Sequence, residues 1–107
     1  MSARYVLAPE AALDLVQIWR YIKKHSSVAA ADRVESVIRE RIVFLARTPG
    51  AGHWSKNLTD EPVRFLPVYS YLIVYRPETK PLQVISILHG SFFIGELRSS
   101  RQGQITS

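Results

Sequence analysis

The stretch LARTPGAG, residues 45–52, divides the sequence into a helical half and a strand-rich half. Pro49, Gly50 and Gly52 end a helix and permit a tight reversal of the chain. Before this break, apolar residues recur every three or four positions, which is typical of helices with one buried face. After it, aromatic and β-branched residues predominate, as they do in strands. The break therefore predicts a fold in which helices come first and most strands follow.

Two helices are predicted before the break. The first starts at about Pro9, a residue well suited to the first position of a helix, and ends near Lys24. Ser26 and Ser27 can cap the second, which continues to the break. Each helix has one apolar face, so we expect the two to form a hairpin. The apolar positions are Ala11, Leu15, Ile18 and Ile22, then Ala30, Val34, Val37, Ile38, Ile42 and Leu45.

Four strands are predicted around this hairpin. Residues 4–7 form a short strand that stops before Pro9, because proline cannot donate to a strand ladder. Residues 63–68 and 69–75 are two adjacent strands, and residues 82–88 form another after a turn at 77–81. The order β-α-α-β-β-β predicts an α+β fold with the helical hairpin on one face of an antiparallel sheet. We expect one domain, residues 1–98, followed by a polar tail, residues 99–107.

Composition limits the function classes. A chain of 107 residues is large enough for one core but not for two domains. It has no cysteine, which excludes disulfides, thiolate zinc sites and cysteine nucleophiles and fits the cytoplasm. No segment approaches the roughly 20 apolar residues of a membrane span, so we expect no membrane association. The net charge of +5 predicts an acidic partner, such as nucleic acid or an acidic protein segment.

A series of motifs in a fixed order resembles the ParE toxins of the wider ParE/RelE superfamily. The motifs are Leu7-Ala8-Pro9 with Asp14-Leu15, Ile18-Trp19 and Tyr21-Ile22; residues 45–52; Val63-Arg64; the alternating Tyr71, Ile73 and Tyr75; and residues 85–90. Each motif alone is common, but their order and spacing cover nearly the whole chain. The resemblance implies a cytoplasmic toxin that inhibits growth, serves plasmid maintenance and binds no cofactor. It also implies a ParD-like antitoxin, whose acidic segment wraps the toxin in a hetero-oligomeric complex.

The superfamily contains two activities, and the resemblance implies which residues distinguish them. RelE-type toxins cut messenger RNA on the ribosome with basic and aromatic residues, whereas ParE-type toxins are associated with inhibition of DNA gyrase. One nuclease arginine falls on Leu72 here, and a later basic residue falls near Ser91-Phe92. Loss of two cations at such a site costs several kcal/mol of transition-state stabilisation. We therefore expect binding without catalysis and no catalytic residue; the alternative is a ribosome-dependent RNase that uses Arg64 with Tyr71 or Tyr75. A third possibility is a detoxified module that binds only its antitoxin.

Candidate target-binding residues are basic or aromatic and follow the break or lie in the strand-rich half. They are Arg64, Trp54, Lys56, His89 and Arg98. A salt bridge from Arg64 to Asp14 or Glu61 is an equally good interpretation of that arginine. Many relatives carry an arginine–aspartate pair after the motif that is His89-Gly90 here, and this chain does not. The histidines have no metal-ligand spacing, so no metal site is expected.

Candidate antitoxin-binding residues lie on the hairpin and near the end of the chain. They are Trp19, Arg33, Phe92, Phe93, Ile94 and Leu97. Trp19 and Tyr21 also fit a place in the core or at its edge, and Asp14 fits a charge that favours the helix dipole. A sheet edge can accept an added strand, and an apolar groove beside the hairpin can accept an amphipathic helix.

Overall fold

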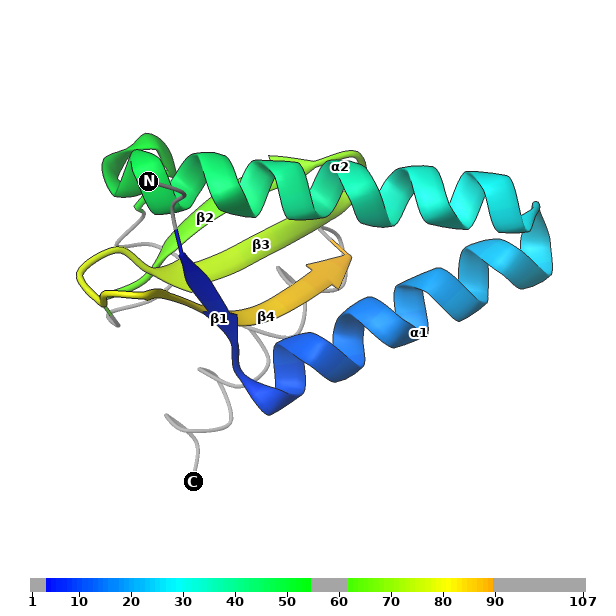
Figure 1. The fold of residues 1–107 in the computed structure, drawn as a ribbon, viewed down its shortest axis with the longest axis horizontal. Coiled ribbons are helices and arrows are strands. Elements are labelled where there is room, and N and C mark those ends of the chain that lie inside the picture. Colours follow the sequence, from blue (N-terminus) through cyan, green and yellow to red (C-terminus); the bar gives the residue numbers. More distant parts are fainter. Residues whose placement is uncertain (1–3, 55–61, 90–107) are drawn as a thin grey trace, which may run out of the picture.

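The computed structural model describes residues 4–54 and 62–89, in which a pair of helices packs on a four-stranded sheet (Figure 1). The elements are β1 (Tyr5–Leu7), α1 (Pro9–His25), α2 (Val28–Arg47), a 3-10 turn η1 (Pro49–Ala51), β2 (Arg64–Val68), β3 (Tyr71–Arg76) and β4 (Leu82–His89). This order confirms the predicted α+β fold. The domain boundary after residue 98 and the tail 99–107 lie outside the described residues.

The sheet differs from the prediction in the direction of one strand. Its order is β1-β4-β3-β2, and β2, β3 and β4 are antiparallel neighbours as expected. β1, however, runs parallel to β4, with Tyr5 opposite Leu82 and Leu7 opposite Val84. Short turns fix the direction of β2, β3 and β4, but β1 is separated from β4 by the rest of the fold. Its direction therefore depends on tertiary packing, which a local pattern does not encode.

The helices start and end where local chemistry favours it. Pro9 occupies the first turn of α1, and Lys23, Lys24 and His25 place basic side chains at its negative end. Ser27 caps α2, since its Oγ accepts a hydrogen bond from the Ala30 amide at 3.0 Å. The hairpin turn is consequently short, and the two helices pack side by side across one face of the sheet (Figure 1).

The main core lies between the hairpin and the sheet. Ile38, Ile42 and Leu45 of α2 are fully buried, and Ile73 and Tyr75 face them from β3. Alternation along β3 turns Leu72 and Val74 to the opposite face, where a second, smaller apolar cluster contains Val63, Phe65 and Val74. Both faces of the sheet are therefore apolar at β3.

Asp14 connects the hairpin to the sheet. It lies in the second turn of α1, beyond the first turn that the dipole interpretation assumed, and its Oδ2 accepts the Ile87 amide hydrogen at 3.0 Å. β1 ends too early to reach this part of β4: the amide of Ala8 donates to Val84 at 2.9 Å, and the carboxylate supplies the next acceptor. Burial is the main cause that raises the Asp14 pKa, while the bond from Ile87 lowers it and Glu10 raises it. The predicted salt bridge between Asp14 and Arg64 is wrong, and Glu61 lies outside the described residues.

A two-residue turn, Tyr69-Ser70, joins β2 to β3 where the sequence predicted uninterrupted strand. Tyr69 has a φ of 56°, in the left-handed region that glycine and asparagine normally occupy in such turns. Its side chain is 60% exposed. The turn was missed because a tyrosine gives no turn signal and is itself common in strands.

Candidate interaction surfaces

Arg64 lies at the corner where the residue 45–52 break meets the sheet. Its Nη1 donates to the Gly52 carbonyl at 2.9 Å. Beside it, the buried hydroxyl of Tyr75 accepts the Gly52 amide hydrogen at 2.9 Å and donates to the Pro49 carbonyl at 2.6 Å. Burial raises the Tyr75 pKa, and the Gly52 bond and the Arg64 charge partly offset this. The half-buried Arg64 guanidinium is thus held in place by the loop that it contacts.

Trp54 belongs to the same corner. His53 forms an antiparallel bridge with Phe65, with both backbone hydrogen bonds at 2.8 Å. This register brings Trp54 beside Arg64, since one follows His53 and the other precedes Phe65. The Trp54 side chain is 51% exposed. A cation and an exposed aromatic ring therefore share one surface, a combination suited to a macromolecular contact.

His89 does not belong to that corner. It pairs with Tyr71 at the other end of β3, whereas Arg64 pairs with Tyr75. Four residues along a strand correspond to roughly 13 Å. The predicted target-binding residues in the described chain consequently form two separate groups, and Lys56 and Arg98 lie outside the described residues.

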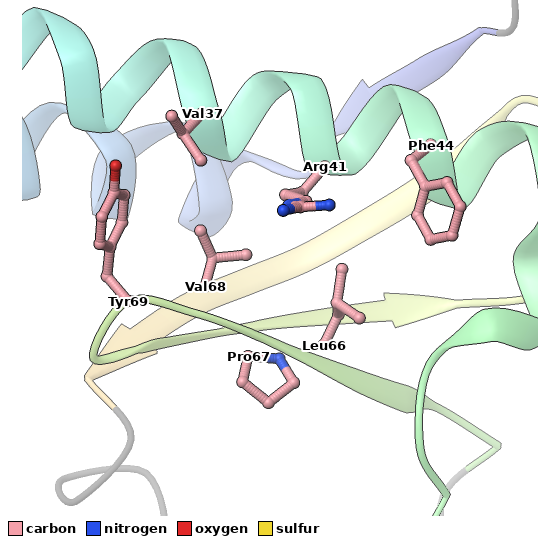
Figure 2. A pocket seen from close by; sticks show the side chains of 7 residues that line it. All are labelled: Val37, Arg41, Phe44, Leu66, Pro67, Val68 and Tyr69. Carbon is pink, nitrogen blue, oxygen red and sulfur yellow. The ribbon is translucent and has the colours of Figure 1, made fainter.

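A groove of about 430 Å³ runs between α2 and the edge strand β2 (Figure 2). Figure 2 shows Val37, Arg41 and Phe44 extending from α2 toward Leu66 and Val68. The backbone of this edge is poorly suited to an added strand. Phe65 already bonds to His53 on this side, and Pro67, the next residue that faces outward, has no N–H.

Trp19 lies in a second groove, of about 310 Å³, on the outer side of the hairpin next to β1. Its Nε1 donates to Asp32 at 2.8 Å, and Lys23 lies 5.4 Å from its ring centroid. The groove is lined by Leu7, Ala12, Leu15, Val16, Trp19, Glu35 and Arg39. Trp19 is half-buried, and Arg33 is exposed on α2. Phe92, Phe93, Ile94 and Leu97 lie outside the described residues.

Arg39 forms the rim of this second groove. Its guanidinium donates to the Tyr5 hydroxyl and to Glu35, both at 3.1 Å. The Tyr5 hydrogen bond is the main cause that raises the Arg39 pKa, and an arginine is charged throughout the physiological pH range in any case. Within the described chain, β1 pairs with β4 on one side alone, and its Val6 side chain is 45% exposed. This outer edge of β1 therefore lies next to the apolar Trp19 groove and the Arg39 guanidinium.

A third hollow, of about 750 Å³, lies between α1 and the end of the sheet. Three tyrosines line it from three elements: Tyr21 from α1, Tyr69 from the turn and Tyr71 from β3. Sequence reasoning did not group these residues, because Tyr21 lies far along the chain from Tyr69 and Tyr71. The sequence offered one indication: the alternation of side chains along β3 places Tyr71 on the side of the sheet that faces the helices. No group of three metal-ligating side chains occurs within residues 4–54 and 62–89.

The family of the chain follows from a match over most of its length. The family model for the ParE toxin of the type II toxin-antitoxin system, parDE, matches residues 5–92. The chain belongs to the ParE toxin family. Among solved structures, the chromosomal ParDE toxin-antitoxin system from P. aeruginosa is similar, with a TM-score of 0.69 and 22% identity over 82% of this chain and 96% of that one. No curated protein sequence matches.

Membership of the ParE family gives the described surfaces their context. A ParE chain is the toxin component of a type II toxin-antitoxin system, so an antitoxin is its partner. The likeness to the P. aeruginosa structure confirms the arrangement of helices and strands. Neither helix of the described chain combines the length and apolar character needed to cross a bilayer.

Proposed function

We propose that this ParE family member inhibits growth by binding DNA gyrase in the cytoplasm, without cleaving a bond, and that a ParD-like antitoxin neutralises it. Leu72 is the observation that favours binding over catalysis. This position corresponds to an arginine of the RelE-type nucleases, and here its side chain packs against the apolar cluster of Val63, Phe65 and Val74. An apolar side chain there cannot hold a scissile phosphate.

One tyrosine of the alternative RNase, Tyr75, supports the same choice. Tyr75 is fully buried, and its hydroxyl is engaged by both Gly52 and Pro49. It is therefore unavailable for stacking on a base or for proton transfer to one. Arg64, in turn, is held by the Gly52 carbonyl. We assign Arg64 and the exposed Trp54 to the contact with gyrase, because a fixed cation beside an aromatic ring suits an acidic macromolecular surface.

A supercoiling assay with purified gyrase tests this proposal. Wild-type toxin should inhibit supercoiling, and Trp54→Ala should weaken inhibition by at least about tenfold if Trp54 is a central contact. Arg64→Gln retains a hydrogen-bond donor for the Gly52 carbonyl but removes the positive charge, so it tests whether that charge contributes to inhibition. Val28→Ala, an exposed apolar position at the hairpin tip, is the control. Unchanged supercoiling at high toxin excess refutes the proposal, and cleavage of translated messages within codons, seen by primer extension, would replace it with the RNase.

For the antitoxin we propose the surface formed by β1 and the Trp19 groove. The outer edge of β1, unpaired among the residues that the structure describes, can accept a strand, and the groove can accept apolar side chains of a helix. Lys23, beside the Trp19 ring, and Arg39, which also pairs with Glu35, supply positive charge for an acidic segment. Arg33, two residues from the groove-lining Glu35, lies on another side of α2. Calorimetry with the protein encoded by the neighbouring gene should show that Lys23→Glu weakens binding more than Arg47→Glu, since each is a basic residue in the last turn of its helix but only Lys23 lies beside Trp19. Both variants change the net charge equally, so equal effects would contradict this location.

A further inference from the structure

The hollow between α1 and the end of the sheet has the dimensions of a ligand site. Its volume, about 750 Å³, lies within the range of small-molecule and side-chain pockets. Figure 1 shows why space remains here: the far end of the hairpin extends beyond the strands. Nothing in the proposed contact with gyrase uses this cavity, which lies at the opposite end of β3 from Arg64.

Aromatic rings form much of the cavity wall. Tyr21 stacks on His25 with ring centroids 4.1 Å apart, and Tyr71 meets the edge of His89 at 5.8 Å. Burial raises the Tyr71 pKa, and the nearby Tyr21 hydroxyl raises it further. These two rings therefore come from separate elements to one place. The face of an aromatic ring carries negative charge density and attracts cations.

Asp14 adds a carboxylate to the same wall. One of its oxygens accepts the Ile87 amide hydrogen, and the side chain also lines the cavity. Among the residues that the structure describes, no lysine or arginine forms an ion pair with it. A half-buried carboxylate without a cation is unfavourable, because burial disfavours the charged form. A cation in the cavity would offset that cost.

Tyr69 supplies the third aromatic ring of the cavity. Its left-handed backbone is unfavourable for a tyrosine by about 1 kcal/mol, and the 60% exposure of its ring shows that packing within the chain offsets little of this. The two-residue turn requires this positive φ, but glycine or asparagine would adopt it without strain, so the turn alone does not account for a tyrosine here. The conformation holds the third ring at the rim of the cavity.

We propose that this cavity binds the guanidinium or ammonium group of an arginine or lysine side chain from a partner protein, with the Tyr21, Tyr69 and Tyr71 rings around the cation and Asp14 as its counter-ion. The negative charge of Asp14 and of the ring faces favours a positively charged side chain over other occupants. A nucleotide would bring its phosphate toward the Asp14 carboxylate, which repels it. A neutral apolar side chain would leave that carboxylate unpaired.

Tyrosine ring signals in NMR spectra of the full chain test the proposal. N-acetyl-arginine amide serves as the probe for an arginine side chain, and N-acetyl-citrulline amide is its neutral counterpart of the same shape. The arginine probe should shift the three tyrosine rings saturably in the millimolar range, because single exposed cation contacts are weak. The citrulline probe should bind at least roughly tenfold more weakly.

Variants assign the binding to the named groups. Asp14→Asn keeps an acceptor for Ile87 and should weaken the arginine probe about tenfold. Tyr69→Asn, which suits the turn, should weaken it about threefold. Phe44→Ala removes an exposed ring from the neighbouring groove and should change nothing.

Four results would overturn the proposal. Equal binding of the citrulline probe would exclude recognition of charge, and unchanged binding by Asp14→Asn would exclude the counter-ion. Ring shifts produced by cytidine monophosphate in place of the arginine probe would indicate a nucleotide site. Much tighter binding of free arginine than of the blocked probe would indicate a metabolite instead of a protein side chain.

Discussion

At the scale of single residues, Gly52 is required by space and not by backbone conformation. Its φ of −75° suits any residue, but a Cβ there would overlap the Tyr75 hydroxyl. Because Tyr75 is fully buried and bonded on two sides, it cannot move away. This contact explains why a glycine closes the break at residues 45–52, where the sequence pattern showed merely that a helix ends.

Gly52→Ala should therefore lower the free energy of unfolding by about 1–3 kcal/mol, the usual cost of overpacking a core. Gly50→Ala is the matched control, since no atom lies within 4 Å of the added methyl group. Urea unfolding of both variants, followed by circular dichroism, measures the difference. Equal stability of the two variants would show that Tyr75 yields to the added methyl group.

Tyr69→Asn should change stability in the opposite direction. Asparagine tolerates the left-handed conformation, so relief of the strain should raise the free energy of unfolding by about 1 kcal/mol. Tyr69→Phe keeps both the ring and the strain and should leave stability unchanged. Thermal unfolding of the two variants measures this, and a loss of stability in Tyr69→Asn would mean that the ring packs more than its exposure indicates.

At the scale of elements, the contact between α1 and β4 depends on one carboxylate. The Asp14 pKa is raised in the folded protein, so the folded state holds this proton more tightly than the unfolded chain. The contribution of Asp14 to stability must then fall as pH rises from below the unfolded pKa through the folded pKa. The direction is opposite to that of a carboxylate in a salt bridge.

Asp14→Asn should consequently be at least as stable as the wild type at about pH 7, and this advantage should disappear near pH 3. The amide oxygen still accepts the Ile87 hydrogen bond. Asp14→Ala leaves that N–H without its acceptor and should cost about 1–3 kcal/mol. Urea midpoints at the two pH values measure both effects. If the wild type becomes more stable relative to Asp14→Asn as the pH rises, the predicted direction of the pH dependence is wrong.

Elements with a strong local signal were predictable from the sequence. The apolar repeat of α2 and the β-branched residues of β4 placed both, since burial of one helix face or of a strand imposes those patterns. The parallel pairing of β1 depends on contacts between distant segments. The tyrosine cavity likewise combines α1, the β2–β3 turn and the end of the sheet. Residue spacing along the chain does not indicate that these segments come together. The Arg64–Trp54 corner was predictable in its residues but not in the Gly52 and Tyr75 bonds that organise it.

At the scale of the whole molecule, charge and packing should control different steps of antitoxin binding. The net charge of +5 attracts an acidic segment over distances longer than a side-chain contact, which accelerates association. The apolar groove beside Trp19 acts after contact and so governs dissociation. This separation rests on the proposed antitoxin surface, and kinetics can resolve the two contributions.

Surface plasmon resonance with the cognate antitoxin should show an association rate that falls at least tenfold between roughly 0.05 and 0.5 M salt, as the screening length shortens, while the dissociation rate changes little. Lys23→Glu should lower the association rate and flatten its dependence on salt. Val16→Ala trims the exposed apolar wall of the groove without changing the charge, and should raise the dissociation rate instead. If both variants alter the same rate constant, charge and packing do not act on separate steps, and if neither variant alters either rate constant, the antitoxin binds elsewhere.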